Sequence, residues 1–198
     1  MANYEPPYSC LHLLGAVAAM LASGRVVQLN QAFKGATYVG TLPEGQLFFE
    51  SNLELDDDGS IYHKQDKTGQ AGTSLSAGHG KSVDANAIPY VVLPRNSFGH
   101  WGIRLGDIAM VLHNGRMSPA IFADHGPEGK LGEGSIELHR RLGHETIHNG
   151  KLINHGITGR VLTFVFPHSG NGRSQPVNAI EAVARRCWYD LKIRAGRT

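Results

Sequence analysis

Residues 119–143 read PAIFADHGPEGKLGEGSIELHRRLG, and this stretch decides how the rest of the chain is interpreted. The apolar run from Pro119 to Ala123 is long enough for a buried strand, and His125-Gly126-Pro127 predicts a turn directly after it. Asp124 is therefore expected at the end of a strand. Ser135 can cap a helix, so a helix of about two turns is predicted to follow it.

Two carboxylates face the loop within this stretch. Asp124 lies at one end of it, and Glu133 lies at the other between Gly132 and Gly134. Such a pair suits general acid/base chemistry, in which one carboxyl gives a proton to a leaving group and the other takes one from water. Glycoside hydrolysis is the commonest use of this arrangement. The structural alternative is that Asp124 caps a turn and Glu133 is a solvated loop residue.

Length and composition predict one domain with an N-terminal extension. The chain has 198 residues, is 41% hydrophobic and carries a formal charge of +2, so nothing in its charge indicates a nucleic-acid partner. We assign residues 1–45 to the extension and residues 46–198 to a single catalytic domain, and expect a monomer. Leu11 to Ser23 predicts an apolar helix packed on the core. This run is too short to span a membrane, and no Lys or Arg precedes it as in a secretory signal.

The region from Glu44 to Asp66 has seven acidic residues and one basic residue, which can attract a cation. Asp56-Asp57-Asp58-Gly59-Ser60 resembles the start of a calcium loop, but Lys67 stands where a bidentate Glu is needed. The loop is therefore expected to be a turn with solvated acids and no metal.

The remaining elements are mainly strands, which gives a mainly β (α+β) fold class. A helix is expected at Val177 to Arg194, and Asn114-Gly115 predicts a tight hairpin. The strands are predicted at Ala36–Leu42, Leu47–Leu55, Ile88–Leu93, Asp107–His113, Pro119–Ala123 and Arg160–Phe166.

The order of the motifs resembles the family 75 glycoside hydrolases, the endo-acting chitosanases. The matching segments are DDDG (56–59), DKTGQAGTS (66–74), DANAIPYVVLP (84–94), LGDIA (105–109), ADHGPEGKLGEGS (123–135) and FPHSG (166–170). The stretch from Asp124 to Gly143 is also similar to double-psi β-barrel proteins of the rare-lipoprotein-A and expansin type, in which a DxGP loop precedes a short helix ending in Leu-Gly. This second resemblance implies a six-stranded barrel.

The resemblance to the chitosanases implies an inverting hydrolase of β-1,4-linked glucosamine polymers that needs no cofactor, with Asp124 and Glu133 as the essential pair. An inverting pair lies about 6.5 to 9.5 Å apart. Glu133, among glycines, is expected to be the acid. The family also implies an extracellular location, although a cytoplasmic one stays open because the chain shows no clean signal peptide.

Other residues are candidates for binding the substrate. Asp56, Asp58 and Asp107 are predicted to hold its ammonium groups, and Trp101 to stack on a sugar ring. The alternatives are solvated turn acids or strand-end caps, and a buried tryptophan.

Two other functions compete with this one. The first is a zinc hydrolase, because residues 144–148 read HETIH and match HExxH, and His139, His144, His148 and His155 together offer zinc ligands. The short distance from Gly143 to Gly150 argues against the catalytic helix that this motif requires. The second is a barrel that binds a polysaccharide or cell-wall glycan without cleaving it. The pairing of Cys10 with Cys187 stays open.

Overall fold

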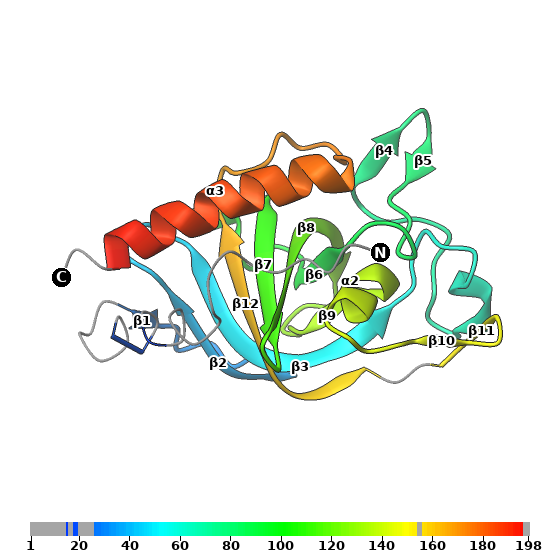
Figure 1. Cartoon of the computed structure of the whole chain (residues 1–198), viewed down its shortest axis with the longest axis horizontal. Helices are drawn as coiled ribbons and strands as arrows, with labels where there is room; N and C mark the ends of the chain where they lie inside the picture. The colour runs from blue at the N-terminus through cyan, green and yellow to red at the C-terminus, as the bar shows by residue number, and fades with distance from the viewer. Residues whose placement is uncertain (1–14, 16–17, 20–25, 154–155, 196–198) are drawn as a thin grey trace.

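The computed structural model describes residues 15, 18–19, 26–153 and 156–195 (Figure 1). Its helices are η1 (His63–Gln65), η2 (Gly99–Trp101), α2 (Ile136–Arg141) and α3 (Val177–Ala195). Its strands are β1 (Val27–Gln28), β2 (Ala36–Thr41), β3 (Leu47–Asp56), β4 (Ser76–Gly78), β5 (Lys81–Ser82), β6 (Tyr90–Pro94), β7 (Ile108–His113), β8 (Arg116–Gly126), β9 (Glu133–Ser135), β10 (Ile147–His148), β11 (Lys151–Leu152) and β12 (Ile157–Phe166).

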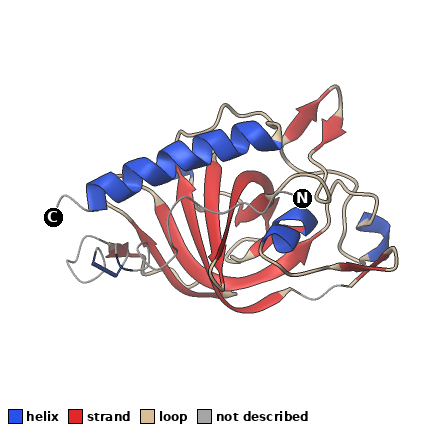
Figure 2. Ribbon diagram, in the orientation of Figure 1, coloured by secondary structure: helices blue, strands red, loops and turns tan. Residues whose placement is uncertain are grey.

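Six strands close into a barrel, which confirms the predicted fold (Figure 2). The main sheet has the order β1-β2-β3-β12-β7-β8-β6-β9, and β9 also pairs with β3. The pairs β6–β8 and β3–β9 are parallel, whereas the other pairs within the barrel are antiparallel. The barrel therefore depends on β9, a strand of 3 residues, to join its two edges.

The two faces of the barrel strands carry separate cores, because successive residues of a strand point to opposite faces. One core includes residues of α3, which lies along the outside of the barrel (Figure 1). In it, the rings of Phe164 and Trp188 are edge to face with centroids 5.3 Å apart. The second core includes Phe49, Val91 and Phe122 and fills the barrel interior.

Three local predictions are confirmed: a hairpin turn, a helix cap and the C-terminal helix. Asn114 and Gly115 have φ of 45° and 77° and connect β7 to β8, as a two-residue hairpin requires. Ser135 caps α2, since its side chain accepts a hydrogen bond from the Leu138 N–H at 3.1 Å. The predicted helix at Val177 to Arg194 is α3.

The sheet begins at Val27, within the predicted extension, because β1 and β2 continue the barrel sheet beyond β3. Of the helix predicted at Leu11 to Ser23, only residues 15, 18 and 19 are described. Cys10 lies outside the described residues, and Cys187 lies half-buried on α3. Among the helices of the described residues, none combines the length and apolar character needed to cross a bilayer.

Candidate active site

Asp124 and Glu133 lie on either side of Val92, the middle residue of β6. Val92 is opposite Asp124 in the pairing of β6 with β8, and opposite Glu133 in the pairing of β6 with β9. Neighbouring strands are about 4.8 Å apart, so the backbones of the two acids are separated by about 10 Å. The barrel thus places the two predicted carboxylates on the two strands that flank β6, although they lie at opposite ends of a loop in the chain.

Gly134 shows which way the side chain of Glu133 points. A Cβ on Gly134 would lie 2.8 Å from Leu138 Cδ2 and 3.2 Å from Leu53 Cδ1, which both belong to the interior core. Because neighbouring residues of a strand alternate, Glu133 points to the outer face, to which Val92 also belongs. The candidate site therefore lies on the outside of the barrel, over β6.

Lys130 holds the carboxylate of Glu133. Its Nζ is 2.7 Å from Glu133 Oε1 and 2.8 Å from Glu54 Oε2. Burial alone would lower the pKa of Lys130, but these hydrogen bonds and the two negative charges raise it overall. The carboxylate of Glu133 is thus held by an ion pair with a partly buried cation.

Gly126 leaves room for the side chain of Glu133. A Cβ on Gly126 would lie 2.7 Å from Glu133 Oε2 and 2.9 Å from Val92 Cγ1. Glu133 therefore reaches across Val92 towards β8, the strand that carries Asp124. This reach shortens the separation of the two carboxyls below that of their backbones.

Asp124 is surrounded by donors rather than paired with a cation. Its Oδ1 accepts hydrogen bonds from the Ser74 N–H at 2.9 Å, the Ser74 hydroxyl at 2.5 Å and the His125 N–H at 2.8 Å. Only 6% of Asp124 is exposed. Ser74 belongs to the long loop after β3, so this loop covers the Asp124 side of the site.

The DDDG segment brings two further acids to Asp124. Asp56 Oδ1 accepts from the Tyr90 hydroxyl at 3.0 Å and from the Asp58 N–H at 2.9 Å. Asp58 Oδ1 accepts from the Gln70 N–H at 2.5 Å. Asp56, Asp58 and Asp124 have carboxylate oxygens within 4.8 Å of one another. The structure therefore joins three of the predicted site acids into one cluster.

The clustering of these acids changes their protonation. Burial raises the pKa of Asp58 to about 8, and the charge of Asp56 adds to this effect. Burial likewise raises the pKa of Asp56 to about 7, with Asp124 and Glu133 adding to it. At neutral pH the cluster therefore retains at least one proton.

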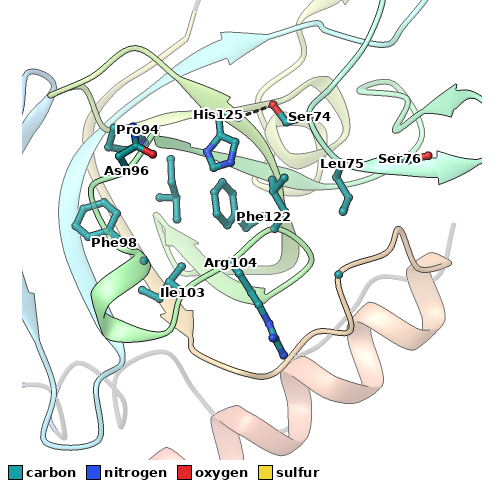
Figure 3. A pocket seen from close by; sticks show the side chains of 14 residues that line it. Ser74, Leu75, Ser76, Pro94, Asn96, Phe98, Ile103, Arg104, Phe122 and His125 are labelled. Carbon is teal, nitrogen blue, oxygen red and sulfur yellow. Dashed lines mark hydrogen bonds between the residues drawn. The ribbon is translucent and has the colours of Figure 1, made fainter.

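A hollow of about 580 Å³ opens beside Asp124 (Figure 3). Ser74 and His125, which both donate to Asp124, form part of its wall. The rings of Phe122 and His125 meet edge to face in the hollow, with centroids 5.2 Å apart. The remaining lining combines apolar side chains with Asn96 and Arg104 and includes no carboxylate.

Asp107 and Trp101 lie elsewhere in the structure. Asp107 is fully buried, and its oxygens accept hydrogen bonds from the backbone N–H groups of Arg104, His168 and Gly170. This carboxylate therefore holds two loops together and has no exposed surface for an ammonium group. Trp101 is half-buried in η2, with its ring 3.6 Å from the His100 ring between centroids.

The HExxH interpretation requires a helix over residues 144–148, and these residues do not form one. α2 ends at Arg141, and the segment from His144 to His148 is a loop that runs into β10. His139 is fully buried, with ring nitrogens 2.9 Å from the Ser135 carbonyl and 3.0 Å from the Leu53 carbonyl. In the part of the chain that the structure describes, the histidines do not form a group with metal-ligand geometry. His155 lies outside the described residues.

Three residues of the site were not predicted from the sequence: Ser74, Tyr90 and Lys130. Lys130 lies three residues before Glu133, and this spacing was the one visible signal. Ser74 lies 50 residues from Asp124, and Tyr90 lies 34 from Asp56, so their contacts arise only in the closed barrel.

The barrel and the acids over β6 together form a candidate site for acid/base chemistry. A sequence model of a known family, described as fungal chitosanase of glycosyl hydrolase group 75, matches residues 53–184. This match covers about two thirds of the chain, including Asp56, Asp58, Asp124 and Glu133, so the chain belongs to this family and is a glycoside hydrolase of the chitosanase type. No curated protein matches the chain.

Proposed function

We propose that the protein is an endo-acting hydrolase that cleaves β-1,4-linked glucosamine polymers such as chitosan with inversion, using Asp124 and Glu133. The observation that carries this proposal is the position of both acids opposite Val92, on the outer face of the barrel. Cleavage within the chain of the polymer is what the family resemblance implies.

The separation of the two backbones supports inversion. Their backbones are about 10 Å apart, and Glu133 reaches towards β8, which brings its carboxylate nearer to Asp124. Inverting hydrolases keep their two carboxyls about 6.5 to 9.5 Å apart so that a water molecule fits between the base and the sugar.

The contacts of the two acids support an assignment of roles opposite to the one expected from the sequence. The ion pair with Lys130 suits Glu133 as the base that activates water. Asp124 lies next to Asp58, which carries a proton at neutral pH, and this suits the acid that protonates the glycosidic oxygen. The catalytic step then breaks the bond between C1 and the leaving oxygen as water attacks C1 from the opposite side.

Negative charge around the site supports a cationic polymer as the substrate. Glu54 is exposed next to Lys130 and can receive an ammonium group. Asp56, at the end of the same strand, is a weaker partner because burial raises its pKa to about 7. The hollow lined by Ser74 and His125 contains no carboxylate and so offers no partner for an ammonium group. Stacking of Trp101 on a sugar remains part of the proposal because an aromatic ring suits a sugar face. Secretion from the cell remains part of it from the family resemblance alone.

The proposal is tested by reducing-end release from chitosan, chitin and peptidoglycan, with and without EDTA. We expect cleavage of chitosan that EDTA does not affect, and an about 10³-fold lower rate in both Asp124→Asn and Glu133→Gln. Glu128→Gln is the matched control, because Glu128 is an exposed acid of the same loop. NMR of the first products should show the α-anomer.

Two results would contradict the proposal. Initial formation of the β-anomer would exclude inversion. Binding of chitosan without release of ends would instead identify a glycan-binding barrel.

A further inference from the structure

The carboxyls of Asp58 and Asp124 form a buried pair within the acidic cluster. Both residues are 6% exposed, and their carboxylate oxygens lie within 4.8 Å of each other. Asp58 comes from the loop after β3 and Asp124 from the end of β8, so the pair links two walls of the site.

The hydrogen bonds around the pair show where its proton lies. Asp124 Oδ1 accepts from three donors, and Asp58 Oδ1 accepts from one, the Gln70 N–H. Two buried carboxyls this close to each other do not both ionise, so the pair keeps a proton. Asp58 accepts fewer hydrogen bonds than Asp124, and burial raises its pKa, so the proton lies on Asp58.

We propose that Asp58 is a positioning residue that stores the proton delivered through Asp124 and thereby sets the upper pH limit of catalysis. This inference rests on the proposed function, with Asp124 as the acid. It gives Asp58 a different role from the ammonium binding expected from the sequence.

The proton balance is simple. The shared proton moves onto Asp124 and then to the glycosidic oxygen as the bond from C1 to that oxygen breaks, which leaves both aspartates ionised. The attacking water gives its proton to Glu133. Two adjacent carboxylates repel each other, so the pair regains a proton from solvent, while Glu133 releases one beside Lys130.

The charged groups around Asp58 determine the pH range. Asp56 at the end of β3 and Asp124 on β8 are its nearest acids, with Tyr90 of β6 bonded to Asp56. Glu133 acts on Asp56 from β9, and its charge is offset by Lys130. Burial and these negative charges raise the pKa of Asp58 to about 8, so the pair loses its proton, and the enzyme its acid, as the pH rises through about 8.

The test is the pH dependence of kcat/KM for Asp58→Asn and Asp58→Glu. The Asn side chain can donate to Asp124 but cannot supply a proton. We therefore expect the basic limb of Asp58→Asn to move down by at least about one pH unit, and the rate at pH 7 to fall about 10- to 100-fold with little change in KM. Asp58→Glu should recover part of the rate. Asp57→Asn is the matched control, since Asp57 is an equally buried neighbour outside the pair.

A second readout does not depend on activity. Infrared difference spectra should show a protonated carboxyl that titrates near pH 8 in the unchanged protein and in Asp57→Asn, and that is absent from Asp58→Asn. An unchanged basic limb together with an unchanged band would overturn the inference.

A bound cation would also overturn the inference. Added Ca²⁺ that raises the melting temperature of the unchanged protein but not of Asp58→Asn would show that the three carboxylates bind metal instead. Full activity of Asp124→Asn would instead disprove the proposed function itself, so the two failures are distinguishable.

Discussion

The two sides of β6 carry the same chemical group in opposite surroundings. On the β9 side, Glu133 contacts the cation of Lys130. On the β8 side, Asp124 lies against Asp58, whose pKa is raised to about 8 mainly by burial. Both acids are largely buried, so burial alone does not distinguish them. The comparison shows that the two carboxyls differ in their partners rather than in their burial.

The larger effect is expected from a variant that displaces the Glu133 carboxylate. In Gly126→Ala, the new Cβ would lie 2.7 Å from Glu133 Oε2, so the carboxylate must leave its position over Val92. We expect kcat to fall about 100-fold, because a shift of about 1 Å in a catalytic group has an effect of this size.

The control for Gly126→Ala is Gly99→Ala, where a Cβ would meet no atom within 4 Å. Thermal unfolding should be similar for the two variants, while steady-state rates on chitosan should separate them. Equal rates would show that the position of Glu133 does not limit catalysis.

A smaller effect is expected when the cation is removed. Lys130→Met removes the ion pair that holds the Glu133 carboxylate in place. The rate on chitosan should fall about tenfold, because the carboxylate is no longer fixed at one position.

The matched control for Lys130→Met is Glu54→Gln, which removes the other partner of Lys130 and keeps the contact with Glu133. Steady-state rates measured on chitosan separate the two variants. An unchanged rate in Lys130→Met would remove the main difference between the two sides of β6.

Much of the fold was predictable because its signals are local. Asn114-Gly115, the Ser135 cap and the apolar strands each depend on neighbouring residues. The closing strand was not predictable, since Glu133-Gly134-Ser135 has 3 residues and no apolar side chain. The sequence predicted six strands and the barrel has six, but β2 lies outside the barrel and β9 takes its place.

The candidate site was predictable in its members but not in their contacts. Asp124 and Glu133 followed from motif order, and Asp56 and Asp58 from an acidic turn. The donors to Asp124 come from Ser74, 50 residues away, and the burial that keeps Asp58 protonated exists only when the loop after β3 folds over the barrel. Asp107 has the same appearance in the sequence as these acids, but its bonds to loop backbone give it a structural role.

The most direct test of the opposite roles uses Asp124→Asn and Glu133→Gln. For each variant, the rate of cleavage is measured on chitosan and on a glucosamine oligomer that carries fluoride as its leaving group. Fluoride leaves without a proton, so a variant lacking only the acid should still cleave it. We predict that Asp124→Asn retains most of the rate on the fluoride but not on chitosan, and that Glu133→Gln loses both. The reverse pattern would make Glu133 the acid and contradict the assignment based on Lys130 and Asp58.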